Sequence, residues 1–270
     1  MHGMKLCMMS VMMGEMSPES IVSYAVECGM TGIDWITLHH STAKYLKKIS
    51  DDAGLQIAAY TPLDSSFVNR ISDGLDELKK AIENACILGA PNMVIPPFPL
   101  ANQKSMSEDR KCWIGFYEKA MPLVQDAGLV LCIESTGFRN SPVASGTELL
   151  EVVKAVPGLK IAFDNGNTAT ADDMTTAFEM VQENVVHFHL KDWKIYHTIH
   201  PGSDLKRTGK YYQDCVIGEG NLDLVTFLKQ HVLPVYNGFF NLEASDPSRE
   251  RTPEQVMKQV CRYLAEHALV

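Results

Sequence analysis

Eight short apolar runs, spread over the whole chain, are the feature that most limits what this sequence can fold into. Each run suits a buried strand, and a segment with helical caps or helical amphipathicity follows each one. The expected strands are residues 4–9, 32–38, 55–60, 92–96, 129–134, 159–164, 185–190 and 238–243. Strands that alternate with helices through short links form a parallel sheet. Eight such units in 270 residues predict an α/β fold, a closed (β/α)8 TIM barrel, as a single domain over residues 1–270.

The expected helices begin and end at residues that favour those positions. Ser17 and Pro18 have the order of an N-cap and a first helical residue, and Gly29 suits the end of that helix. A later helix is expected to have Thr147 as its cap. The remaining expected helices are residues 42–52, 73–88, 108–126, 172–183, 222–230 and 253–266. Residues 192–221 form the longest segment without a regular pattern, which is typical of a functional loop.

A doubly wound open sheet is the competing architecture. Such a sheet usually carries a glycine-rich phosphate turn after its first strand. Here the segment after the first strand contains only Gly14, and the glycine-rich residues 218–221 follow a loop rather than a strand. The pattern therefore favours the barrel.

Four polar residues lie where apolar strands are expected to end. These are Glu134, Asp164, His189 and Glu243. Alternate residues of a barrel strand face the lumen, and the apolar neighbours of these four residues leave all of them on the inward side. Three carboxylates and one imidazole suit Mn²⁺ or Mg²⁺ best and also accept Co²⁺ or Zn²⁺. We predict that the four residues bind one divalent metal ion.

Other polar residues of the seventh strand allow more than one interpretation. A polar residue at the end of a single strand often caps a helix or pairs with a lysine, but four such strands in one chain favour a shared site. His187 has the same inward parity as His189, and it suits a contact to substrate or a hydrogen-bonded place in the core. Asp192 suits either the orientation of Lys191 or of an imidazole, or the cap of a turn.

Composition narrows the class of partner and the compartment. A formal net charge of −9 disfavours nucleic acid, because binding to phosphates needs a basic surface. The seven cysteines show no CxxC spacing, which indicates reduced thiols in a cytoplasmic protein. No apolar run approaches the roughly 20 residues that cross a membrane. The expected partner is a small molecule.

At these residues the chain resembles the xylose-isomerase-like TIM-barrel superfamily, which includes sugar phosphate isomerases and epimerases, inosose dehydratases and the endonuclease IV group. The segments that carry the resemblance are IES at 133–135, FDNGN at 163–167, HFHLKDW at 187–193, GEGNLD at 218–223 and LEAS at 242–245. The resemblance implies the same four metal ligands as the strand pattern.

Two positions depart from the superfamily pattern. Asn167 stands where many members have a histidine that contacts substrate or a second metal. Thr37 stands where many members have a glutamate, with His39 just beyond it. The resemblance implies that Asn167 and His39 lie near the substrate. The missing histidine weakens the interpretation as an endonuclease for abasic DNA.

The sequence thus predicts a metal-dependent isomerase or epimerase of a sugar, a sugar phosphate or a keto-polyol. Glu134 and Glu243 are the expected catalytic residues, which transfer protons through a metal-stabilised enediolate. His187 and Lys191 are expected to bind substrate oxygens. An inosose-type dehydratase, an endonuclease-like phosphodiesterase and a non-enzymatic sugar binder are the alternatives. Because barrels of this kind commonly associate, a homo-oligomer is a possible state.

Overall fold

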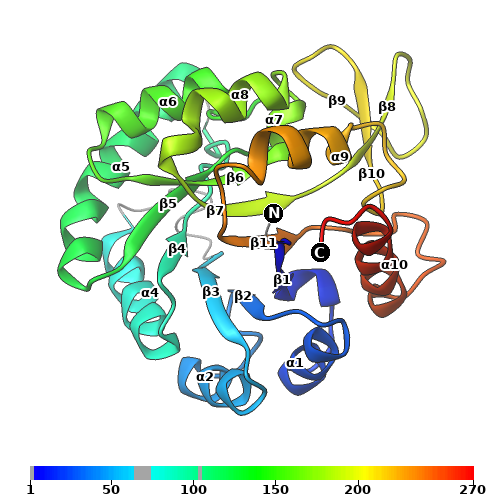
Figure 1. Ribbon diagram of the computed structural model, residues 1–270. Helices are drawn as coiled ribbons and strands as arrows, with labels where there is room; N and C mark the ends of the chain where they lie inside the picture. Colours follow the sequence, from blue (N-terminus) through cyan, green and yellow to red (C-terminus); the bar gives the residue numbers. More distant parts are fainter. Residues whose placement is uncertain (1–2, 64–73, 103–104) are drawn as a thin grey trace.

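Eight parallel strands close into a barrel in the computed structural model, which describes residues 3–63, 74–102 and 105–270 (Figure 1). The order around the barrel is β1-β11-β7-β6-β5-β4-β3-β2. The strands are β1 (Lys5–Met9), β2 (Gly32–Ile36), β3 (Gln56–Thr61), β4 (Asn92–Val94), β5 (Val130–Glu134), β6 (Lys160–Asp164), β7 (Val185–Leu190) and β11 (Phe239–Leu242). The predicted (β/α)8 barrel is confirmed, and each expected strand overlaps one of these eight.

Helices surround the barrel, as Figure 1 shows. They are α1 (Pro18–Glu27), α2 (Ala43–Asp52), α4 (Leu75–Leu88), α5 (Met106–Asp126), α6 (Gly146–Ala155), α7 (Asn165–Ala169), α8 (Met174–Val181), α9 (Leu224–Phe227) and α10 (Pro253–Glu266), with the short 3-10 helices η1 (Ser10–Met13) and η2 (Gln182–Asn184) and the π-helix η3 (Leu228–Val232). Ser17 caps α1 as expected, since its side chain accepts a hydrogen bond from the Ser20 amide. The expectation for α6 was wrong, because Ser145 and Glu148 form a capping box there in place of Thr147.

Alternate residues of the strands divide the core into two parts. The outward side chains pack against the helices, and the aromatic rings of Phe163, Phe178 and Phe188 contact one another there. Inside the barrel, Ala59, Val94, Cys132 and Ala162 form a small separate cluster. Glu134 of β5 and Asp164 of β6 follow Cys132 and Ala162 two positions later, at the carboxyl ends of these strands.

Residues 192–221 are more regular than the sequence indicated. They contain an antiparallel sheet of β8 (Trp193–Tyr196), β10 (Tyr211–Asp214) and β9 (Asp204–Leu205), in that order, which we call the cover sheet. Tyr212 of this sheet donates a hydrogen bond from its hydroxyl to the Ala169 carbonyl, 2.9 Å away. The expected irregular loop is therefore corrected to a small sheet attached to the barrel at α7.

The two ends of the described chain lie side by side. The Met4 amide donates a hydrogen bond of 2.7 Å to the Leu269 carbonyl. Within the residues that the structure describes, no helix has the length and apolar character needed to cross a bilayer.

Candidate metal centre

The four side chains that the strand pattern grouped lie together at the carboxyl ends of the strands. Glu134 and Asp164 are the last residues of β5 and β6, His189 lies in β7, and Glu243 follows β11 directly. One ligand atom from each residue lies within 4.8 Å of the ligand atoms of the other three. Residues that are 109 positions apart in the chain therefore meet at one point, because parallel strands deliver their carboxyl ends to the same rim.

Asn167 holds two of these carboxylates in place. Asp164 is the N-cap of α7, and its Oδ1 accepts a hydrogen bond of 2.6 Å from the Asn167 amide. The side-chain nitrogen of Asn167 donates to the Ser135 carbonyl at 3.1 Å and lies 3.5 Å from Glu134 Oε1. Asn167, one of the two departures from the superfamily pattern, thus packs directly against the predicted metal ligands.

The close carboxylates change one another's titration. Burial, together with the charges of Glu243 and Glu134, raises the pKa of the Asp164 carboxyl well above its usual range. Burial alone would lower the pKa of His189, but the charges of Glu134 and Asp34 outweigh it and raise that pKa well above the ordinary value. The site thus concentrates negative charge that favours a cation.

Lys191 supplies a positive charge beside this cluster. Its ammonium lies 2.5 Å from Glu243 Oε1 and 3.6 Å from Asp214 Oδ1. Burial alone would raise the pKa of Glu243, but the charge of Lys191 outweighs it and lowers that pKa. Burial alone would lower the pKa of the Lys191 ammonium, but the charges of Glu243 and Asp164 outweigh it and raise that pKa. Glu243 is therefore held as a carboxylate.

The residues fit a hard divalent cation. Asp164 Oδ2 is buried and has no hydrogen-bond partner among the described residues. An orphaned carboxylate oxygen in a dry site costs free energy unless a cation or a donor satisfies it. Three carboxylates and an imidazole are also the donor set expected for Mn²⁺ or Mg²⁺ and acceptable to Co²⁺ or Zn²⁺. The residues present thus fit a divalent cation, and their role as its ligands stays a prediction.

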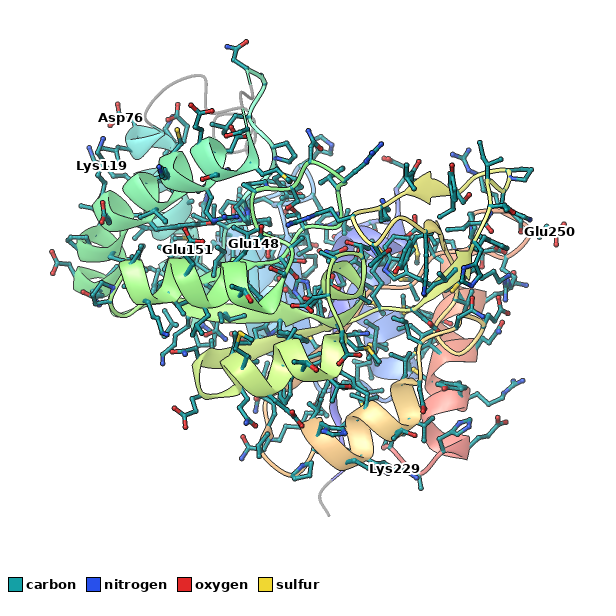
Figure 2. All side chains as sticks on the ribbon, turned by 90° about the horizontal axis from the view of Figure 1, so that it is seen from above. Asp76, Lys119, Glu148, Glu151, Lys229 and Glu250 are labelled. Carbon is teal, nitrogen blue, oxygen red and sulfur yellow. The ribbon has the colours of Figure 1, made fainter. Side chains whose placement is uncertain are left out.

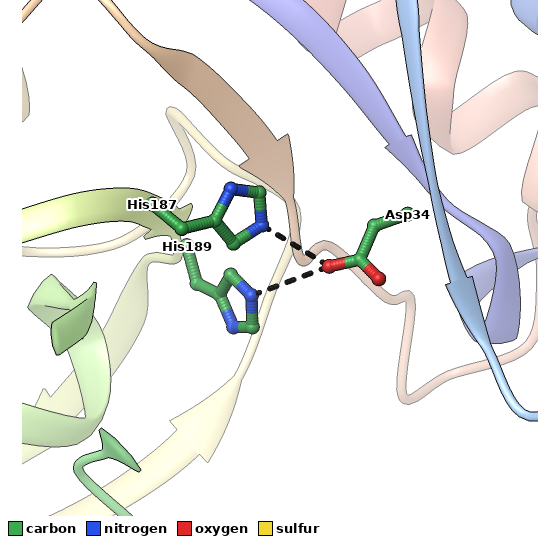
Figure 3. Close-up of side chains that lie close together, drawn as sticks. All are labelled: Asp34, His187 and His189. Carbon is green, nitrogen blue, oxygen red and sulfur yellow. Dashed lines mark hydrogen bonds and ion pairs between the residues drawn. The ribbon is translucent and has the colours of Figure 1, made fainter. Parts of the chain in front are cut away.

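Asp34 is a buried carboxylate that the sequence analysis missed. It lies within β2, and its Oδ2 is 3.1 Å from His187 Nε2 and accepts a hydrogen bond of 2.9 Å from the Asn241 side chain (Figure 3). Although burial alone would raise it, the pKa of Asp34 is lowered by His187 and His189. The strand pattern identifies polar residues at strand ends, and Asp34 lies inside its strand. The signal was present in the apolar stretch GIDWI, where an aspartate occupies an inward position.

A cavity of about 340 Å³ opens above the four residues. Its walls include three of them, Glu134, His189 and Glu243, together with Asn167 and Lys191. The cover sheet adds Trp193, and Lys206 follows that sheet's edge strand. The expected substrate residues Asn167 and Lys191 therefore border the cavity.

His187 and His39 lie elsewhere. His187 is 1% exposed and bonds Asp34, below the level of the cavity. His39 Nε2 is 2.8 Å from Ser10 Oγ, and its ring packs edge-on against Trp35. Neither histidine is among the residues that line the cavity. Their positions match a hydrogen-bonded place in the core and at the rim, so the substrate contacts predicted for them stay predictions.

Asp192 caps a turn, which was one of its two expected roles. Its carboxylate accepts hydrogen bonds from the amides of Gly218 and Gly220, both at 3.0 Å, and from that of Leu222 at 3.3 Å. Two of the segments that carry the superfamily resemblance are therefore bonded to each other.

Comparisons with known proteins show which family the chain matches. The family model described as xylose isomerase-like TIM barrel matches residues 22–267. A comparison with curated protein sequences found no match.

Three solved structures share the fold over nearly the whole chain. The protein IolI, whose structure holds a zinc atom, has a TM-score of 0.78 at 17% identity, with 98% of each chain covered. The 3-keto-D-glucoside 4-epimerase YcjR from E. coli has a TM-score of 0.75 at 16% identity, covering 97% of this chain and 99% of that one. AsbF from Bacillus anthracis, a probable 3-DHS dehydratase, has a TM-score of 0.71 at 18% identity, with coverages of 97% and 99%. The chain belongs to the xylose isomerase-like TIM barrel family.

Proposed function

We propose that this protein is a divalent-metal-dependent isomerase or epimerase of a sugar or a sugar-derived keto compound. One observation carries the proposal. Two glutamates from separate strands, Glu134 and Glu243, border the same cavity of about 340 Å³ beside Asp164 and His189. A cavity of that volume suits a small molecule the size of a monosaccharide. The epimerase among the structural relatives supports the same class of reaction.

Glu134, Asp164, His189 and Glu243 would hold the cation. Mn²⁺ or Mg²⁺ suits this donor set best, and the zinc in the IolI structure supports a divalent ion in general. When bound, such an ion acts as a Lewis acid that polarises a carbonyl and a neighbouring hydroxyl.

The two glutamates would transfer protons. One carboxylate removes the proton from the carbon next to the carbonyl, and the electron pair of that C–H bond shifts to the carbonyl oxygen to give an enediolate. The other glutamate, as a carboxylic acid, returns a proton to carbon or oxygen. Lys191 keeps Glu243 ionised through their contact of 2.5 Å, as a base requires. Lys191 and Asn167 border the same cavity and would bind substrate oxygens.

Deuterium exchange tests the proton-transfer roles. Wash-in from D₂O into a panel of ketoses, aldoses and inososes, with Mn²⁺ present, identifies the substrate with the wild-type protein. We expect Glu134→Gln and Glu243→Gln to lower the exchange rate by roughly 10²–10⁴-fold, because the amide neither accepts nor returns a proton. Glu151→Gln on α6 is the control and should exchange normally. Undiminished exchange in both site variants would remove the glutamates from this role.

A dehydratase is the second candidate. Lys191 places an ammonium beside Glu243, which could protonate a departing hydroxyl of the same enediolate. The probable dehydratase among the structural relatives supports this alternative. The two reactions differ in product, since loss of water gives a keto-deoxy compound with new ultraviolet absorbance whereas an epimer has the mass of the substrate. Mass spectrometry of the product distinguishes them.

A further inference from the structure

A second polar layer lies in the barrel beneath the metal centre. It consists of Asp34, His187 and Asn241, which are at most 1% exposed. The carboxylate of Asp34 contacts both other residues through Oδ2, and it also lies 3.7 Å from His189 Nε2 (Figure 3). Figure 3 shows both histidines of β7 reaching toward this one oxygen from across the barrel. Burial of a carboxylate costs free energy of desolvation, so the position of Asp34 beneath a candidate ligand indicates a functional role.

The two nitrogens of His189 face different carboxylates. Nδ1 lies 3.1 Å from Glu134 Oε1, on the side of the metal centre, and Nε2 faces Asp34. Nε2 is buried and makes no hydrogen bond among the described residues, and Asp34 Oδ2, at 3.7 Å, is the acceptor that it faces. A neutral imidazole has one N–H and one lone pair, so if Nδ1 turned its lone pair to a cation beside Glu134, the hydrogen would lie on Nε2, directed at Asp34. Asp34 thus lies behind the ring of a candidate ligand.

We propose that Asp34 is a positioning residue that fixes the orientation and tautomer of His189 for metal binding. The inference rests on the proposed metal centre. His187 and Asn241 in turn hold Asp34, because each directs a nitrogen at its Oδ2. A carboxylate behind a ligating histidine is a general device for raising the affinity of a metal site.

A second cation among Asp34, His187 and His189 is the competing explanation. Their ligand atoms also lie within 4.8 Å of one another, and Asp34 Oδ1 and Asn241 Oδ1 have no hydrogen-bond partner among the described residues. Against it, both imidazoles approach Asp34 Oδ2, which already accepts a hydrogen bond from the Asn241 side chain. One neutral imidazole also offers a single lone pair, so His189 serves one cation only. Counting the ions separates the two explanations.

The test is calorimetric titration of chelator-treated protein with Mn²⁺ and with Co²⁺. We expect one ion per wild-type chain. Asp34→Asn should bind one ion with an affinity lowered by roughly 10- to 100-fold, and the absorption spectrum of its Co²⁺ form should differ. Asp109→Asn is the matched control, because Asp109 is a buried aspartate on α5 that accepts a hydrogen bond of 2.8 Å from the Leu100 amide. Its affinity should equal that of the wild type.

Each other outcome has a distinct meaning. Equal affinity in Asp34→Asn and the wild type overturns the inference, and so do two ions in the wild type with one in the variant. A wild-type protein that binds no ion overturns the proposed function instead. If Asp34→Asn fails to fold by circular dichroism, Asn241→Ala keeps the carboxylate but removes one donor to it. We expect that variant to lose affinity several-fold, and unchanged affinity there overturns the inference.

Discussion

Asp192 binds a whole turn through one carboxylate. Besides the amides of Gly218, Gly220 and Leu222, it accepts a hydrogen bond of 2.8 Å from the Trp193 amide. Burial raises the pKa of Asp192 despite these hydrogen bonds. Its neighbour Lys191 contacts Glu243, so the turn and the candidate metal centre share one backbone segment. The missing side chain of Gly220 is what allows the close approach to Asp192.

We predict that Gly220→Ala lowers the free energy of unfolding by about 2 kcal/mol, because overpacking at a closed site forces a shift of its surroundings. A Cβ atom on Gly220 would lie 2.1 Å from Asp192 Oδ1 and 2.6 Å from the Trp193 carbonyl oxygen. Urea unfolding followed by circular dichroism measures the change.

Gly115→Ala is the matched control for this substitution. Gly115 lies within α5, and a Cβ atom there meets nothing within 4 Å. Alanine has the higher helix propensity, so this variant should gain about 0.5–1 kcal/mol. Equal effects at the two glycines would contradict the steric argument.

At the residue scale, the sequence predicted which polar side chains face the lumen where the alternation of a strand could be checked. The inward parity of Glu134, Asp164, His189 and Glu243 follows from the apolar residues that flank them, and the four side chains do converge. Asp34 was not predicted, because its partner His187 is 153 positions away and no local sequence pattern links the two residues. A buried hydrogen-bond network between distant strands becomes visible only when the barrel is closed.

An ionic network attaches the cover sheet to the helices around the barrel. Arg207, which lies between β9 and β10, donates to both carboxylate oxygens of Glu148 on α6, at 2.7 and 2.8 Å. Arg110 of α5 donates to the same carboxylate at 2.8 Å. Figure 2 labels Glu148 together with Glu151, the residue one turn later on this helix. Three separate elements thus meet at Glu148.

The Glu148 network gives a pH-dependent stability. Burial alone would raise the pKa of Glu148, but hydrogen bonds from Arg207 and the Ala144 amide outweigh it and lower that pKa from 4.5 to about 2. A depressed pKa stabilises the folded state above the unfolded value, and this contribution is lost as the pH falls from about 4.5 toward 2. We predict that Glu148→Gln costs about 2 kcal/mol at pH 7, after discounting for the water that reaches the group.

Urea unfolding of both proteins at pH 7 and at pH 3 checks this prediction, and the difference between them should shrink at the lower pH. Glu151→Gln is the control, because Glu151 contacts Arg110 at 3.0 Å but its side chain is 50% exposed. It should cost less than about 0.5 kcal/mol. A difference that stays constant with pH would show that the charge of Glu148 is not the cause.

At the element scale, prediction succeeded for long apolar segments and failed for short polar ones. The eight strands have continuous apolar runs, which position them to within a few residues. The cover-sheet strands have four, two and four residues and carry Lys194, Asp204 and Gln213, so no hydrophobic period marks them. These strands form because contacts with the barrel, such as the hydrogen bond from the Thr208 amide to the Thr170 carbonyl, hold the cover sheet in place.

At the scale of the whole molecule, the candidate metal centre connects one half of the barrel. Its four proposed ligands lie on or directly after β5, β6, β7 and β11, which are consecutive strands of the barrel, each paired with the next. Three carboxylates held close together repel one another and destabilise the folded state unless a positive charge neutralises them. A cation bound there is therefore expected to stabilise the folded barrel as a unit, since the unfolded chain does not bring the four residues together.

We predict that Mn²⁺ at about a hundredfold excess over its dissociation constant adds roughly 2.7 kcal/mol to the free energy of unfolding, and raises the melting temperature by roughly 5–10 °C for a chain of this size. Differential scanning calorimetry of chelator-treated protein, with and without Mn²⁺, measures the shift, and EDTA should reverse it. Asp164→Asn removes one buried ligand with little change in volume, so its melting temperature should respond to Mn²⁺ weakly. An equal response in the variant and the wild type would place the stabilising ion elsewhere on the protein.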